Sequence, residues 1–424
     1  MSWIARLQSR LDAEGFARYV SVLMAGTLGA HLITVAGIPV TTRLYSPEAF
    51  SILGVYSGIL SILLTLATLS LHIGIPIADT HRRALGLVAG AGLVLLANIT
   101  LLSLVLLVAG DLIIELLNRP DFTPYLLLLV PGLLLGGCYA TLQMWFSRQK
   151  QFALVATTRV LRSAGGTGTQ LAFGFAGGGP VGLVLGHLLY NGLGVFGLLR
   201  RFMHDERASL RQLTRADLVK SLRRNRSYAY FTTIENLANV AAIQLPVLAI
   251  AANPSAGEVG LLYLAQTVMM LPMMLIGSSV GQVFIAEAPQ HYRDGSLWPF
   301  TKRVLRGLTL AGVPLLALVG VLAPFLAGPI LGQDWERTGE LIAWITPWMV
   351  LQFLYSPLST IFYVTERQSL AMVLQIFGLV LRLGAVLLAI SFSPTVAMPV
   401  YAISGAVFYL SVIIIVLAIS RLNK

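Results

Sequence analysis

Charge is scarce in this sequence. Only 11% of its 424 residues are Asp, Glu, Lys or Arg, against about 25% in soluble domains. Hydrophobic residues make up 56%, and the mean hydropathy is +0.80. A single cysteine, Cys138, excludes an intrachain disulfide, and the short alternating segments of membrane-spanning strands are absent. Together these features exclude a soluble domain and indicate an all-α integral membrane protein.

Motifs for nucleotide or metal chemistry are also lacking. Gly165–Gly168 lies within an apolar run and has no following Lys-Ser/Thr, so it is no phosphate-binding loop. The acidic residues of the central polar stretch, Asp205, Glu206 and Asp217, lack the spacing of metal ligands. Loops predicted to lie outside the membrane are short, which speaks against a membrane polymerase or glycosyltransferase. We therefore expect a protein that is not an enzyme and that needs no cofactor or metal.

Long apolar runs occupy most of the chain, and each approaches the ~20 residues that cross the hydrocarbon core. No cleavable signal peptide is evident, and residues 1–18 combine arginines with apolar positions at helical spacing, as in an interfacial amphipathic helix. We predict twelve spans: 19–41, 50–77, 84–108, 122–146, 152–175, 180–199, 228–251, 258–284, 303–327, 339–364, 369–391 and 396–420.

Basic residues fix the expected orientation. With the N-terminus inside, 23 of the 29 Lys and Arg residues fall in cytoplasmic segments and 3 in outside loops. Nine of them belong to the polar stretch Arg200–Arg226. Both termini are therefore expected in the cytoplasm. The net charge of +11 is explained by loops that face anionic lipid, and no nucleic-acid partner is expected.

The two halves of the sequence resemble each other. Ile38–Val40 returns as Leu245–Val247 at an offset of 207, and Val160–Arg162 returns as Val380–Arg382 at an offset of 220. A slowly drifting offset is typical of related copies that differ in loop length.

Four segments follow from this repeat. They are an interfacial helix (1–18), an N-lobe (19–199), a basic cytoplasmic linker (200–227) and a C-lobe (228–424). We predict two pseudo-symmetric six-helix lobes around a central cavity.

Three arginines lie inside predicted spans: Arg159, Arg162 and Arg382. An arginine at the membrane centre costs about 2.5–3.5 kcal/mol on insertion scales, and such residues normally face a watery cavity. Arg159 and Arg162 share a helix face, and Arg162 and Arg382 are repeat equivalents. We interpret them as binding an anion that must cross the membrane, since guanidinium groups bind phosphate bidentately. Pairing with a buried carboxylate, or snorkelling of Arg159, is the alternative.

A polar cluster in the seventh span is the second candidate site. It comprises Glu235, Asn236 and Asn239. It could bind sugar hydroxyls or carry a coupling proton, and an ion pair between Glu235 and an arginine is equally compatible with the pattern. His31 in the first span is a candidate for the opposite wall of a cavity, although a lone histidine there is more often a packing residue.

Several longer motifs resemble a known family. Arg43–Phe50 (RLYSPEAF), Gly74–Ile77 (GIPI), Tyr263–Phe284 (YLAQTV through LP to IGSSVGQVF) and Leu331–Trp335 (LGQDW) look like signatures of the polysaccharide biosynthesis flippases. These form the O-antigen and exopolysaccharide branch of the multidrug/oligosaccharidyl-lipid/polysaccharide exporter superfamily. The resemblance runs over essentially the whole chain and implies a MATE-like fold.

The resemblance also implies a function. It predicts a flippase that moves undecaprenyl-pyrophosphate-linked oligosaccharide units across the bacterial inner membrane by alternating access. Membrane lipids, and the polymerase and chain-length proteins of the pathway, are the partners it implies. A cation-coupled drug exporter of the same fold is one alternative, and a membrane polymerase or glycosyltransferase is an alternative of another class.

Overall fold

The apolar runs form α-helices. This is expected in a membrane, because lipid offers no hydrogen-bonding partners and a helix satisfies its backbone N–H and C=O groups within its own segment. The computed structural model describes residues 25–253 and 258–422, and over these ranges it contains helices, turns and no strand. Ten of the helices so described are long and apolar enough to span a membrane. The chain is therefore an all-α, multi-pass membrane protein. The predicted interfacial helix 1–18 lies outside the described residues.

Each predicted span coincides with at least one helix. The helix Ala25–Leu44 is followed by α2 (Pro47–Leu66), α3 (His81–Leu117), α4 (Thr123–Leu126), α5 (Leu129–Arg148), α6 (Phe152–Phe175), α7 (Pro180–Gly192), α8 (Val195–Arg211), α9 (Arg215–Ala251), α10 (Glu258–Arg293), α11 (Leu297–Leu331), α12 (Glu336–Leu358), α13 (Ile361–Val364), α14 (Gln368–Phe392) and α15 (Ala397–Leu422).

Two boundaries differ from the sequence prediction. The span predicted at 50–77 ends at Leu66, because Leu69 and Ser70 adopt left-handed φ values of 46° and 55° and a short 3₁₀ turn follows. The seventh span, predicted at 228–251, is the end of a longer helix, α9, that begins at Arg215. The polar stretch before it is helical as well, and the buried face of α8 includes Leu198 and Phe202.

The chain groups into two compact units. Unit 1 contains residues up to 37, 66–108 and 127–229, and unit 2 contains 38–65, 109–126 and 230–424. Residues 38–65 and 109–126 come from the N-terminal half of the sequence and group with unit 2. The change of unit in α3 falls at Ala109, whose φ of −124° and ψ of 16° interrupt the helix.

Unit 1 is built on close packing between α3 and the start of α9. A Cβ at Gly86 would lie 2.4 Å from the Ser221 hydroxyl, and one at Gly90 would lie 2.8 Å from a Leu222 methyl. These two glycines therefore let α9 rest directly on α3. Trp145 and Phe202 meet edge to face in the same unit, with ring centroids 5.2 Å apart.

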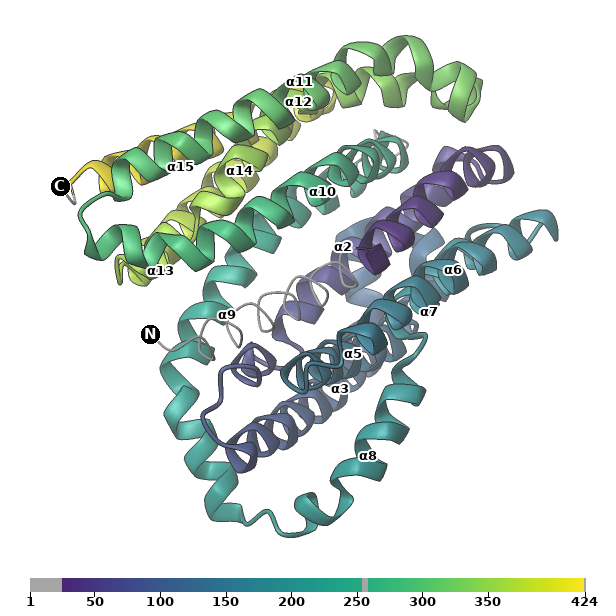
Figure 1. Cartoon of the computed structure of the whole chain (residues 1–424). Coiled ribbons are helices and arrows are strands. Elements are labelled where there is room, and N and C mark those ends of the chain that lie inside the picture. The colour runs from purple at the N-terminus through teal and green to yellow at the C-terminus, as the bar shows by residue number, and fades with distance from the viewer. Residues whose placement is uncertain (1–24, 254–257, 423–424) are drawn as a thin grey trace. The chain divides into compact units, whose positions relative to one another are not determined.

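Unit 2 contains a bundle in which α12 packs against α10, α11 and α15, and α14 packs against α15 (Figure 1). Gly405 of α15 leaves room for the indole of Trp348, because a Cβ there would lie 2.8 Å from that ring. Trp348 is thereby held flat against α15, beside α14, where it forms part of the site described below.

Candidate functional site

Arg382 is enclosed by aromatic rings in unit 2. It lies on α14 and is 0% exposed. Its guanidinium carbon is 4.2 Å from the ring centroid of Trp348 on α12 and 5.0 Å from that of Tyr401 on α15. Tyr401 is itself fixed, because its hydroxyl accepts a hydrogen bond from Gln266 (2.9 Å) and donates one to the carbonyl of Ile243 (3.1 Å). We call this arrangement the Arg382 cage.

The charge in this cage is not neutralised within the described part of the chain. None of the three guanidinium nitrogens of Arg382 has a hydrogen-bond partner there, and no described carboxylate forms an ion pair with it. The Trp348 indole nitrogen is also buried and forms no hydrogen bond of normal geometry with any described residue. Cation–π contacts recover about 2 kcal/mol or more when desolvated, but each unpaired buried donor costs about 1–3 kcal/mol. The cage therefore leaves donors that an anion could satisfy.

Unit 1 contains a second cage of the same construction. The guanidinium carbon of Arg162 on α6 lies 3.7 Å from the ring centroid of Tyr139 on α5 and 5.1 Å from that of Tyr190 on α7. Its Nε donates to the Tyr190 carbonyl. In both units the arginine comes from the helix between the two that supply the aromatic rings. Arg162 differs from Arg382 in being partly exposed.

Arg159 and His31 lie together in unit 1, apart from the Arg162 rings. An Nη of Arg159 donates to the Thr27 hydroxyl at 2.7 Å, and its charge acts on His31. One turn further along α6, the hydroxyls of Ser163 and Thr34 are 2.8 Å apart. Arg159 thus binds the helix Ala25–Leu44, whereas Arg162 contacts α5 and α7, so the two side chains diverge although they share a face by spacing.

Glu235 and Asn239 line a polar cavity of about 280 Å³ in unit 2. Tyr363 donates a hydrogen bond to Glu235 at 2.8 Å, and the amide nitrogen of Asn239 donates to Gln375 at 2.9 Å. Glu235 forms no ion pair with any described residue. Tyr409 connects the two features, because it lines the cavity and interacts electrostatically with Arg382.

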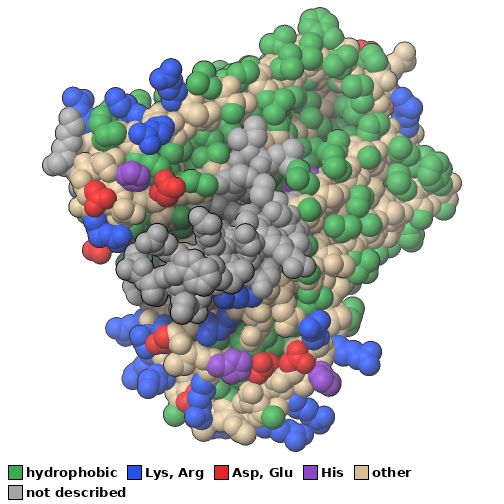
Figure 2. Space-filling view, in the orientation of Figure 1, with side chains coloured by type: hydrophobic (Ala, Val, Ile, Leu, Met, Phe, Trp, Pro, Cys, Tyr) green, Lys and Arg blue, Asp and Glu red, His purple; other side chains and the backbone are tan. Residues whose placement is uncertain are grey.

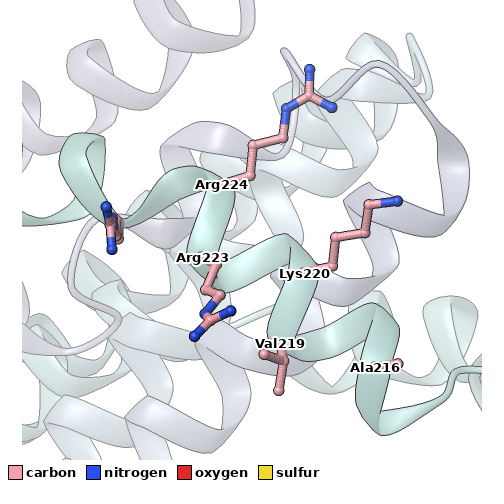
Figure 3. A pocket seen from close by; sticks show the side chains of 6 residues that line it. Ala216, Val219, Lys220, Arg223 and Arg224 are labelled. Carbon is pink, nitrogen blue, oxygen red and sulfur yellow. The ribbon is translucent and has the colours of Figure 1, made fainter.

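A basic helix face occupies the first turns of α9 in unit 1. Lys220, Arg223, Arg224 and Arg226 line a surface hollow of about 790 Å³ together with Val219. Figure 3 shows that the side chains of Arg223 and Arg224 leave α9 on opposite sides. Basic side chains also gather over α8 and the start of α9 in Figure 2. Because this face directly precedes the apolar segment that begins at Ala229, it is placed to meet anionic headgroups.

Acidic partners attach this part of α9 to the start of α3. Asp79 pairs with Arg83 and Arg224, both at 3.0 Å, and Arg82 pairs with Asp217 at 2.7 Å. The hydrogen bond from Arg83 holds the pKa of Asp79 below its usual value, and hydrogen bonds from Thr214 do the same for the pKa of Asp217. Both carboxylates are charged at neutral pH and keep α9 against α3.

Sequence reasoning found the arginines but not what surrounds them. Tyr139 and Tyr190 precede and follow Arg162 by 23 and 28 positions, whereas Trp348 and Tyr401 are 34 before and 19 after Arg382. The aromatic partners of the two arginines are therefore not separated by the 220 residues that separate Arg162 from Arg382. The apolar runs contain several aromatic residues each, so the sequence does not indicate which of them contacts an arginine. Gln352, Gln375 and Tyr363 were missed for the same reason, although an amide inside a span is a usable signal.

Comparison with known protein families gives a match over most of the chain. The family model described as polysaccharide biosynthesis protein matches residues 40–340. No protein of curated function matches the sequence.

Solved structures with a similar fold cover nearly all of this chain. An inward-facing multidrug resistance MATE family transporter of the MOP superfamily matches with a TM-score of 0.67 and 14% identity, covering 96% of this chain and 98% of that one. The lipid II flippase MurJ, inward closed, matches with 0.65 and 13%, covering 96% and 90%. A MOP superfamily transporter from Pyrococcus furiosus, described as having a binding pocket of reversed polarity, matches with 0.55 and 15%, covering 96% and 94%. The fold is thus MATE-like.

Proposed function

Since the chain belongs to the polysaccharide biosynthesis protein family, we propose that it is a flippase for undecaprenyl-pyrophosphate-linked oligosaccharide repeat units. It would move them from the cytoplasmic to the periplasmic leaflet of the bacterial inner membrane by alternating access, for O-antigen or exopolysaccharide synthesis. Both termini would lie in the cytoplasm. A flippase of lipid II, which shares the fold, supports this class of substrate by analogy only.

The unpaired guanidinium of Arg382 is the observation that carries the proposal. A buried cation without a carboxylate is costly in a membrane and is usually functional. A pyrophosphate would supply the missing acceptors, because its oxygens match the planar donors of a guanidinium and bind them bidentately. Arg162 provides a second such group in unit 1, and its partial exposure leaves it accessible. We assign a pyrophosphate-binding role to Arg382 within unit 2 and, separately, to Arg162 within unit 1.

A cation-coupled exporter of drugs or organic cations is the second candidate. It is favoured by the fold shared with a multidrug transporter and by Glu235, a carboxylate inside a polar cavity. Such a protein would bind its cargo through carboxylates and aromatic rings. The aromatic rings here are already occupied by arginines, which would repel a cationic cargo.

The deciding experiment measures movement of a lipid-linked oligosaccharide across the bilayer of proteoliposomes that contain the purified protein. We expect the wild type to move the lipid, and the double variant Arg162→Ala/Arg382→Ala to lose movement by at least tenfold. Arg382→Lys should retain part of the activity, since an ammonium keeps the charge but not the bidentate geometry. Arg367→Ala, an exposed arginine of the same unit, serves as the matched control and should behave as wild type.

Three results would contradict the proposal. Undiminished movement by the double variant at equal protein level would remove the arginines from the site. Transport of an organic cation, with no movement of the lipid by any variant, would establish the exporter instead. Lengthening of the oligosaccharide during the assay would point to the third class, a polymerase or glycosyltransferase.

A further inference from the structure

The polar cavity of unit 2 has an unusual lining for a membrane protein. Among the described residues its walls carry four carboxamides, three tyrosines, two serines and Glu235, and no aliphatic side chain. They come from α9, α12, α13, α14 and α15 and from the turn after α12. Its ~280 Å³ corresponds to about nine water molecules at ~30 Å³ each, which is enough for one pyranose ring with its hydroxyl groups.

Hydrogen-bonding capacity in this cavity exceeds what the protein itself uses. Each carboxamide offers two donors and an acceptor. Asn239 donates to Gln375 at 2.9 Å, and Gln375 donates to Tyr355 at 3.5 Å, which is a long contact. The Oε1 atom of Gln352 is buried and has no partner among the described residues. A buried acceptor left unpaired costs about 1–3 kcal/mol, so this atom favours a ligand that donates a hydrogen bond.

The carboxamide, hydroxyl and carboxylate groups that line the cavity indicate which class of ligand it can bind. An anion would need a cation in the wall, and none of the described lining residues carries one. Metal cations bind through several oxygens, commonly from more than one carboxylate, whereas Glu235 is alone here and is already engaged by Tyr363. Alternating donors and acceptors beside the tyrosine rings suit a neutral molecule with many hydroxyls and an apolar face, which is a sugar.

The cavity lies within reach of the Arg382 cage. Gln352 follows Trp348 by four residues on α12, which is about 6 Å along the helix, and Gln375 precedes Arg382 by seven on α14, about 10 Å. A pyrophosphate bound by Arg382 would therefore place the sugar attached to it near the carboxamides. Tyr409, which lines the cavity and interacts with Arg382, lies between the two features.

We propose that this cavity is a saccharide subsite that binds the sugar next to the pyrophosphate. The proposal rests on the flippase function above and adds a place for the sugar within unit 2. It also assigns a role to Gln352, whose unpaired acceptor receives a sugar hydroxyl.

Gln352→Leu tests the subsite, because the Oε1 atom that it removes forms no hydrogen bond with the described part of the protein. Three lipids are compared in proteoliposomes: the full lipid-linked oligosaccharide, its single-sugar precursor and the bare undecaprenyl pyrophosphate. We expect the variant to move both sugar-bearing lipids about tenfold more slowly and the bare lipid at the wild-type rate. Asn239→Leu should act in the same direction, and Gln290→Leu, an exposed amide of α10, should change nothing.

A binding measurement keeps the test independent of lipid movement. The probe is the free oligosaccharide released from the same lipid by mild acid, titrated calorimetrically into the purified wild type and into Gln352→Leu. Binding by the wild type that weakens about tenfold in the variant supports the subsite even if no protein moves lipid, in which case only the flippase proposal fails. Equal binding by both proteins, or equal slowing of all three lipids, would overturn the subsite. The cavity would be a cation site instead if two results were found together. Lipid movement by Glu235→Gln would no longer depend on sodium or protons, and Gln352→Leu would move lipids with and without sugar at the same rates as the wild type.

Discussion

Replacing Arg382 by Met should stabilise the folded protein while it abolishes transport. Met has a similar length, bends to fill irregular space and makes favourable contacts with aromatic rings. It would therefore keep most of the packing against Trp348 and Tyr401. What it removes is a buried charge whose three nitrogens lack partners in the described part of the chain.

The size of the effect follows from two opposing contributions. Unpaired buried donors cost about 1–3 kcal/mol each, and desolvated cation–π contacts recover about 2 kcal/mol or more. Replacement of buried charged groups by well-packed apolar ones stabilises proteins by about 1–4 kcal/mol. At about 2–4 °C for each kcal/mol in a domain of 150–250 residues, the melting temperature of the purified variant should rise by several degrees.

Thermal unfolding in detergent, with and without inorganic pyrophosphate, is the assay. Pyrophosphate should raise the melting temperature of the wild type, since a ligand at 100 times its Kd adds about 2.7 kcal/mol. It should raise that of Arg382→Met less, because only the Arg162 group remains. Arg367→Met controls for the loss of one positive charge. Trp348→Ala should melt well below the wild type, because it removes a buried ring. The reasoning fails if Arg382→Met does the same, or if pyrophosphate stabilises neither the wild type nor Arg382→Met.

Two further predictions concern the scaffold. Gly260→Ala should destabilise unit 2 by at least about 1–3 kcal/mol, because its Cβ would lie 1.9 Å from the backbone oxygen of Pro47. The control Gly307→Ala, whose Cβ would meet nothing within 4 Å, should be neutral or mildly stabilising. Equal melting temperatures of the two variants would contradict this packing. The pKa of Asp79 is lowered in the folded state, so its bonds to Arg83 stabilise fully above its unfolded pKa of about 3.8 and are lost as pH falls through the lower folded value. The protection of backbone amides in the first turns of α9 against hydrogen exchange should accordingly fall below about pH 4, and in Asp79→Asn it should already be reduced at neutral pH.

Helix positions were the most predictable property of this chain. A helix that crosses the membrane needs a long apolar run, and such a run can be recognised from one continuous segment of the sequence. The failures occurred where a local backbone state decided the outcome, as at Leu69 and Ser70, whose positive φ values end the second span early. The start of α9 at Arg215 was not predicted, because polar residues give no membrane signal and the packing partners Gly86 and Gly90 are distant in sequence.

The candidate site was predictable only in part. An arginine in an apolar run is conspicuous, and the offset of 220 linked Arg162 to Arg382. Their partners are aromatic residues on other helices, at spacings that do not repeat. Which rings meet a guanidinium depends on how neighbouring helices are rotated, and periodicity within one helix does not determine that rotation.

The Arg382 cage also constrains how the protein is made. Trp348 precedes Arg382 in the chain and Tyr401 follows it on α15. During synthesis α14 must therefore enter the membrane with its arginine before one wall of the cage exists. Its many leucines and isoleucines, each worth about −0.3 to −0.6 kcal/mol for insertion, offset the arginine's cost of about 2.5–3.5 kcal/mol. The apolar excess of α14 is thus a requirement of biogenesis, and polar substitutions on its lipid-facing side should impair insertion well before they affect the finished transporter.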